Sequence, residues 1–130
     1  SYDVPWDDNL VVEGDFRRTG GLAGCERLLS RAPDLTAIFA MTDDMAFGVY
    51  EAATAHGLRI PADLSVIGYN DVAMARLLSP PLTTVSYPTS DLARGAVEAC
   101  VGDVALERMQ VVLASELIVR KSVAAPRSRV

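Results

Sequence analysis

The sequence predicts an α/β fold in which helices cover both faces of a parallel sheet. Segments with the length and composition of buried strands alternate along the chain with amphipathic helices. Two of these segments, residues 36–41 and 64–69, are continuous apolar runs, which are typical of strands buried on both faces. A helix between two such strands returns the chain to the same end of the sheet, so neighbouring strands are expected to be parallel.

Turn residues set the boundaries of these elements. Gly57 suits the left-handed position after a helix, and Pro80 with Pro81 stops the short helix before them. Residues 124–130 are expected to form a frayed tail. We expect strands at 10–12, 36–41, 64–69, 82–85, 110–114 and 116–120, and helices at 20–30, 43–56, 73–78 and 88–101.

Composition indicates an ordinary folded protein without affinity for nucleic acid. Half of the 130 residues are apolar and 22% are charged, which is typical of a globular domain with a core and excludes a disordered chain. The net charge of −5 repels phosphate backbones, so this chain alone is not expected to hold DNA. No apolar run reaches the roughly 20 residues of a membrane span, and no membrane association is expected.

The two cysteines, Cys25 and Cys100, lack the spacing of a metal site. Each lies in an apolar helical pattern, so we expect both to be buried free thiols, as suits a reducing cytosol. Spacing alone leaves a disulfide between them open.

Ligands of such sheets bind beyond the carboxyl ends of the strands, which directs attention to four loops. These are residues 13–18, 42–44, 69–71 and 86–88. Thr42 opens the loop between a buried strand and a helix. A hydroxyl there caps the helix, or it points into a binding cleft, and the residues alone leave both interpretations open.

Asn70, Tyr69 and Phe16 are the further candidate ligand contacts. The amide of Asn70 offers an acceptor and two donors, which suits the paired hydroxyls of a sugar. Tyr69 supplies an apolar face beside it, and Phe16, in a polar loop, is placed to stack on a sugar ring. An ordinary turn or helix cap at 69–71 and a local loop anchor at Phe16 stay open as structural alternatives.

Catalytic chemistry is not expected. His56 is the single histidine, and no serine, cysteine or carboxylate is arranged with it as a catalytic set. No phosphate-binding loop, nucleophile elbow or zinc-protease motif occurs. The sequence therefore predicts a protein that is not an enzyme and needs no cofactor and no metal.

The helix at 43–56 has a second apolar face. Its core face is already provided by residues such as Val49 and Ala53, whereas Phe47 and Tyr50 lie on another side. Leu77 and Leu78 add apolar surface nearby in the sequence. Such a helix is either deeply buried or packs against a second molecule.

Three segments and the end of the chain carry a resemblance to a known family. The run GLRIPADLSVIGYND at 57–71, followed by PPLTTV at 80–85, is its most specific part. With residues 36–48 and 116–122, these segments resemble the C-terminal half of the effector-binding region of LacI/GalR (lactose-repressor) regulators. The resemblance implies a periplasmic-binding-protein-like fold of two lobes, closing on a small effector, usually a sugar or related metabolite, in a dimer with an N-terminal DNA-binding domain.

The resemblance also assigns residues to two surfaces. Thr42 stands where the family commonly has Asn, and Asn70 where it commonly has Asp, so an anionic acceptor has become neutral and the hydroxyl pattern of the ligand is expected to differ. The effector contacts map onto Phe16, Thr42, Asn70 and Tyr87. The homodimer contacts map onto Phe47, Tyr50, Glu51, Leu77 and Leu78.

The resemblance implies an incomplete C-terminal lobe. Residues 1–87 correspond to that lobe, 88–114 to a segment of an absent N-terminal lobe, 115–123 to the returning strand and 124–130 to a disordered tail. The apolar helix within 88–114 is expected to pack against another copy, refold onto its own lobe or be swapped between partners.

We therefore expect the effector-binding and dimerisation part of a cytoplasmic, sugar-responsive bacterial transcription regulator. Operator DNA would be reached only through an N-terminal domain that this fragment lacks. The alternative is a fragment of a periplasmic sugar-binding protein of a transporter, and the sequence upstream would distinguish the two.

Overall fold

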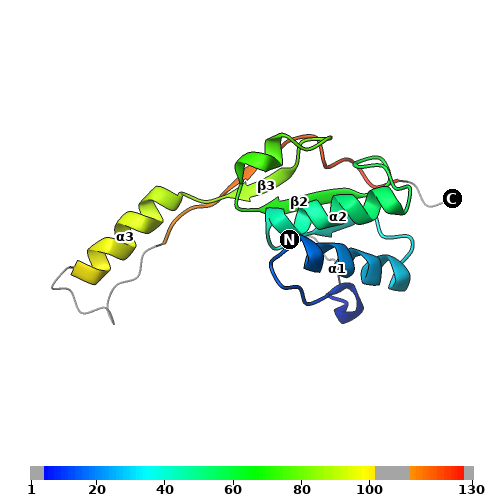
Figure 1. Cartoon of the computed structure of the whole chain (residues 1–130), viewed down its shortest axis with the longest axis horizontal. Coiled ribbons are helices and arrows are strands. Elements are labelled where there is room, and N and C mark those ends of the chain that lie inside the picture. The colour runs from blue at the N-terminus through cyan, green and yellow to red at the C-terminus, as the bar shows by residue number, and fades with distance from the viewer. Residues whose placement is uncertain (1–4, 102–111, 128–130) are drawn as a thin grey trace.

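A computed structural model describes residues 5–101 and 112–127, which form a four-stranded sheet with helices packed on it (Figure 1). The first three strands are parallel, as expected, but the fourth is antiparallel to its neighbour. The sheet is therefore mixed, and the expectation of a parallel sheet is wrong for this strand. In spatial order the strands are β1 (Ala37–Phe39), β2 (Ser65–Tyr69), β3 (Thr83–Ser86) and β4 (Glu116–Ile118).

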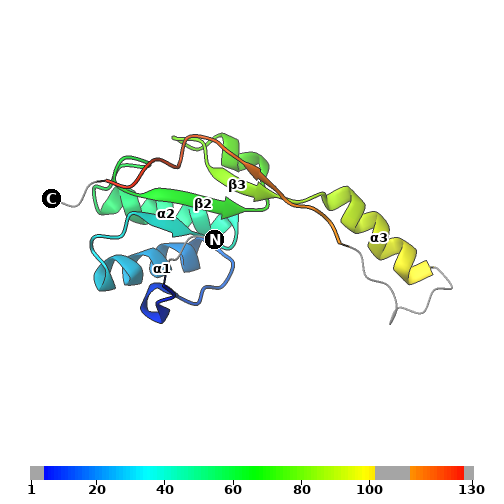
Figure 2. The ribbon, with the colours of Figure 1, turned by 180° about the vertical axis from the view of Figure 1, so that it is seen from behind.

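One face of the sheet carries the two long helices α1 (Arg18–Arg31) and α2 (Asp43–Ala55). In Figure 1, α2 lies in front of β2, and from behind, in Figure 2, no helix among the described residues covers the strands. On β1, Ile38 joins the core, whereas Phe39 on the other face is 54% exposed. The expectation of helices on both faces is thus wrong for the part of the chain that the structure describes.

Two glycines let the helices α1 and α2 pack with their backbones in contact. A Cβ atom built on Gly48 would lie 2.0 Å from the carbonyl oxygen of Arg18 and 2.4 Å from the amide nitrogen of Leu22. A Cβ atom on Gly21 would lie 2.0 Å from the carbonyl oxygen of Met45. Neither position has room for a side chain. The fully buried apolar core lies between this helix pair and the strands and includes Cys25, Ala53, Leu64 and Val66.

One predicted strand is absent, and a second is absent in the part of it that the structure describes. Around residues 10–12 the chain instead forms the short 3-10 helix η1 (Asp8–Leu10), because the side chain of Asp7 caps it by accepting from the amide of Asn9. Val11 is extended but pairs with none of the described strands. Of the strand expected at 110–114, residues 112–114 have no regular structure, and the others lie outside the described residues.

The helices otherwise match the expectations closely. α2 ends at Ala55 and Gly57 has a φ of 67°, as the left-handed position after a helix requires. The short helix expected at 73–78 is the 3-10 helix η2 (Ala73–Arg76). The end of the chain is anchored as far as Ala124, whose amide donates to the Ser65 hydroxyl at 3.1 Å.

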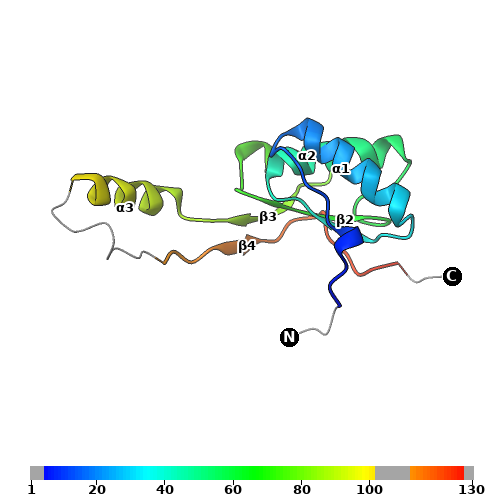
Figure 3. The ribbon, with the colours of Figure 1, turned by 90° about the horizontal axis from the view of Figure 1, so that it is seen from below.

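Helix α3 (Thr89–Val101) lies apart from the rest of the fold (Figure 3). The apolar face that the sequence predicts for this helix is not covered by the other residues that the structure describes, since Leu92 is 52% exposed.

The two cysteines differ in burial. Cys25 is buried as predicted, and burial raises the pKa of its thiol to about 11. The prediction that Cys100 is buried is wrong, because its helix contacts neither the sheet nor α1. Both thiols are free.

The helix at 88–101 therefore does not fold back onto its own lobe, which was one of three expected outcomes. Contact with a neighbouring copy, or exchange between copies, stays a prediction, and residues 102–111 of this segment lie outside the described residues.

Candidate functional site

The predicted ligand loops meet at one edge of the sheet. Because β1, β2 and β3 are parallel and in register, with Phe39 opposite Ile67 and Tyr69 opposite Val85, their carboxyl ends lie side by side. The segments that follow them, residues 40–44, 69–72 and 86–88, therefore share this edge. Thr42 and Asn70 lie at the same end of the sheet, as the sequence predicts.

Thr42 both caps α2 and holds the loop that precedes α1. Its hydroxyl accepts from the amide of Met45 at 3.1 Å and donates to the carbonyl oxygen of Phe16 at 3.3 Å. The capping interpretation of Thr42 is thus correct, and one lone pair of its hydroxyl is left for a ligand. The ring of Phe16 is 65% exposed, and its backbone has a φ of 62°, which is uncommon for a residue with a side chain.

An aromatic pair is formed by Tyr69, which ends β2 directly before Asn70, and Tyr87, which follows β3. The rings of Tyr69 and Tyr87 are stacked, with centroids 5.6 Å apart and an angle of 26° between their planes. The amide nitrogen of Asn70 donates to the carbonyl oxygen of Val85 at 2.9 Å, which holds the start of the loop against β3. The φ of Asn70 is 112°, so its side chain projects from a strained backbone.

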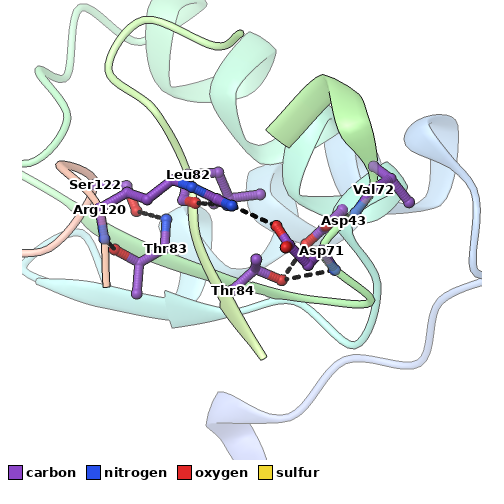
Figure 4. A network of polar contacts seen from close by, with 8 residues as sticks. All are labelled: Asp43, Asp71, Val72, Leu82, Thr83, Thr84, Arg120 and Ser122. Atoms are coloured by element: carbon purple, nitrogen blue, oxygen red, sulfur yellow. Dashed lines mark hydrogen bonds and ion pairs between the residues drawn. The ribbon is translucent and has the colours of Figure 1, made fainter. Parts of the chain in front are cut away.

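A polar network supports this loop from within the protein (Figure 4). The carboxylate of Asp43 is fully buried and accepts from the Thr84 hydroxyl at 2.6 Å and from the amide of Val72 at 2.9 Å. Burial raises the pKa of Asp43 above its usual range, against the opposing effect of these hydrogen bonds. A Cβ atom on Gly68 would lie 2.2 Å from this carboxylate, so the close approach of β2 to Asp43 requires glycine at position 68.

The network continues to the end of the chain. The guanidinium of Arg120 donates to Asp71 at 2.5 Å and to the carbonyl oxygen of Leu82 at 2.8 Å. Ser122 accepts from the amide of Thr83 and donates to β2, so residues 120–122 are fixed to the sheet. Within the described residues, every buried side-chain nitrogen or oxygen has a hydrogen-bond partner.

The structure thus joins the predicted contacts in two groups, Phe16 with Thr42 through a hydrogen bond and Tyr69 with Tyr87 through ring stacking. Sequence reasoning missed the roles of Asp43, Asp71 and Arg120. An acidic residue at each of two strand ends was visible, but it is also typical of turns and helix caps. The partnership with Arg120 spans 49 positions and depends on the fold.

The predicted contact surface on α2 lies beside a groove of about 800 Å³. Phe47, Glu51 and Leu78 line it, together with Met74 of η2, and Leu77 next to it is 72% exposed. Tyr50 also lines the groove but is buried in its own chain, with its hydroxyl donating to the carbonyl oxygen of Pro80 at 2.9 Å.

The part of the chain that the structure describes has neither a metal cluster nor a membrane helix. In no place there do three His, Cys, Asp or Glu side chains lie close enough together to hold a metal ion. The helices of the same residues are too short or too polar to cross a membrane.

Residues 4–123 match the family described as the periplasmic binding protein-like domain, which covers the whole sheet and its loops. The chain belongs to this family. Its periplasmic binding protein-like fold confirms the fold class expected from the sequence, apart from the uncovered face and the mixed sheet.

The similar members of the family are transcription regulators. The chain is 46% identical over 95 residues to the ribose operon repressor of Haemophilus influenzae, covering 73% of this chain and 29% of that protein. It is 38% identical over 123 residues to the HTH-type transcriptional regulator CelR of Thermobifida fusca, covering 92% and 36%. The chain thus spans about a third of the length of these relatives.

A solved structure with a similar fold is a complex with a sugar. The complex of the transcriptional regulator CelR with cellobiose matches with a TM-score of 0.81 at 38% identity, covering 91% of this chain and 37% of that one. The similarity to these regulators agrees with the LacI/GalR resemblance that the sequence carries.

Proposed function

We propose that this chain binds a sugar effector at the carboxyl edge of its sheet, as part of a LacI-type transcription regulator. The observation that carries the proposal is the loop of Asn70, which holds an amide in a strained backbone conformation beside the stacked rings of Tyr69 and Tyr87. Strained residues of this kind cluster at binding sites. A neutral amide next to aromatic faces suits a ligand with both hydroxyl groups and an apolar ring face.

The names of the similar regulators support the same ligand class. One relative is a ribose operon repressor and one structure is a complex with cellobiose. We infer that the ligand of this chain is a saccharide. We also infer that binding, and not catalysis, is its role, because the edge offers hydrogen-bond donors, acceptors and rings without a nucleophile activated by a base.

Replacing Asn70 by glycine tests the site. Glycine removes the amide and tolerates a φ of 112°, so the change does not add the strain that alanine would. Loss of a hydrogen bond to a sugar hydroxyl is expected to weaken binding by about 1–3 kcal/mol, which is roughly 5- to 150-fold. Titrations of the chain with cellobiose and with ribose, followed by NMR shifts, measure the affinity.

The matched control for Asn70 is Asn9, the other asparagine of the chain, which is exposed on η1. Asn9→Gly should leave the sugar affinity unchanged. Equal affinities of Asn70→Gly and the wild type for the sugar that binds would contradict the assignment of Asn70. Absence of binding of either sugar to the wild type would contradict the proposed ligand class for these two sugars.

We further propose that α2 and η2 form a homodimer interface. Phe47, Met74 and Leu77 present apolar surface along the groove, and the ion pair of Arg18 with Glu51, at 2.8 Å, borders it. A two-fold interface needs such a self-complementary patch, with apolar anchors at its centre and charges at its rim. Contact with DNA would be made by another domain, because this chain carries a net charge of −5.

Leu77→Asp is expected to shift the chain from dimer to monomer in sedimentation equilibrium. Leu77 is 72% exposed, so a charge there disturbs an interface without disturbing the core, whereas Phe47 is partly buried and its replacement would also affect folding. Val119 is equally exposed at 72%, and Val119→Asp is the control. A dimer lost in Val119→Asp and kept in Leu77→Asp would place the interface elsewhere.

A further inference from the structure

Arg120 is absent from the predicted ligand contacts, yet its side chain ends at the loop that carries Asn70 (Figure 4). One guanidinium nitrogen donates to the Asp71 carboxylate at 2.5 Å, and the two side chains are only 15% and 18% exposed. The other nitrogen donates to the carbonyl oxygen of Leu82 at 2.8 Å. The amide of Arg120 itself donates to the Thr83 hydroxyl at 2.9 Å. Arg120 is therefore held at both ends.

The loop that Arg120 reaches needs support. Asn70 has a φ of 112° and Asp71 has a φ of 51°, so two successive residues with side chains occupy an unfavourable region. Each costs about 1–3 kcal/mol and persists only where the surroundings impose it. Three successive amides of this loop are engaged, by Val85 on Asn70, by Thr84 on Asp71 and by Asp43 on Val72.

The middle amide of the three is the weakly held one. The distance from the amide nitrogen of Asp71 to the Thr84 hydroxyl is 3.4 Å, against 2.9 Å for its two neighbours. The strong contact of Asp71 is made by its side chain, with Arg120. A hydrogen bond between two charged, mostly buried groups is stronger than a neutral one, and the planar guanidinium fixes the direction of its donors.

We propose that Arg120 is a positioning residue for ligand binding, which holds Asp71 so that Asn70 keeps the conformation that presents its amide. This inference rests on the proposed function, in which the amide of Asn70 binds a sugar. The ion pair also links two parts of the chain, because Arg120 follows β4 and fixes the loop that carries Asn70. Displacement of β4 would then be transmitted to Asn70 through one ion pair.

Amide hydrogen exchange tests the positioning without any ligand. In Arg120→Met, the amides of Asn70, Asp71 and Val72 should exchange about tenfold faster relative to the amide of Cys25 in α1, because a charge-assisted hydrogen bond is lost. The ratio corrects for a general loss of stability, which would accelerate all of these amides together. Arg120→Lys keeps the charge but cannot hold Asp71 and Leu82 with a planar fork, so an intermediate ratio is expected.

Lys121→Met is the matched control, since Lys121 is the adjacent cation and its side chain is exposed. It should leave the exchange ratio and the sugar affinity unchanged. Arg120→Met should bind whichever of cellobiose and ribose binds the wild type about tenfold more weakly. An unchanged exchange ratio in Arg120→Met overturns the proposal, and so does an unchanged affinity.

The two proposals can fail separately. If neither sugar binds the wild-type chain, the proposed function fails for these ligands, and the exchange ratio alone decides whether Arg120 fixes the loop. If a sugar binds and Asn70→Gly weakens it but Arg120→Met does not, the function stands and the positioning role of Arg120 is wrong.

Discussion

Replacing Gly48 by alanine is expected to destabilise the chain by about 3 kcal/mol, because overpacking of this kind forces two elements apart. The added Cβ atom would lie 2.0 Å from the carbonyl oxygen of Arg18 and 2.4 Å from the amide nitrogen of Leu22. Both are backbone atoms of α1, which cannot move aside as the end of a side chain can. Urea unfolding followed by circular dichroism measures the change.

Gly24→Ala is the matched control. Gly24 is also buried in a helix, but its added Cβ atom would meet only Val12, at an ordinary contact distance of 3.7 Å. Alanine should there stabilise the chain by about 0.5–1 kcal/mol through its better helix propensity. The same sign of effect at both glycines would contradict the close crossing of α1 and α2.

Removing the carboxylate of Asp43 is expected to cost about 3–5 kcal/mol, since Asp43→Ala leaves the Thr84 hydroxyl and the Val72 amide without their charged acceptor. Asp44 is the control within the same first helical turn, because its side chain is exposed. Asp44→Ala should cost no more than about 1 kcal/mol, the typical effect of one charge on a helix dipole. Equal losses in the two variants would show that the network does not stabilise the fold.

The pH dependence of this effect has a definite sign. The pKa of Asp43 is raised by burial, so its native state binds a proton more tightly than the unfolded chain does. Its contribution to stability is full below the ordinary pKa of 3.8 and is lost as the pH rises through the higher native value. The stability difference between wild type and Asp43→Asn should therefore favour the wild type more at low pH than at pH 7, in denaturant series at both values.

Local sequence patterns were sufficient to predict the first three strands and the α-helices. The apolar runs at 36–41 and 64–69 became β1 and β2, and Gly57 marked the end of α2 as expected. The strand expected at 10–12 did not form. Asp7 accepts from the amide of Asn9 with its side chain and from the amide of Leu10 with its carbonyl oxygen, and β pairing depends on a partner that the local pattern does not show.

The site was predictable in part for the same reason. Ligands of parallel sheets bind beyond the carboxyl ends of the strands, and this rule placed Thr42 and Asn70 at one edge. The rule needs only the alternation of strands and helices, which the sequence shows. The buried acceptor role of Asp43 and the pairing of Asp71 with Arg120 depend on which side chains the folded chain brings together. The exposure of Cys100 was missed because an apolar helical face indicates what a helix can bury and not what lies against it.

Helix α3 follows directly from the far end of β3 (Figure 3). Thr84 and Val85 pair with β2 on one side and with β4 on the other, whereas Ser86 pairs with β4 alone. Tyr87 and Pro88 then join this last paired residue to the helix. The leverage on α3 is therefore concentrated in a link of two residues, because none of the described helices packs against it to fix its direction.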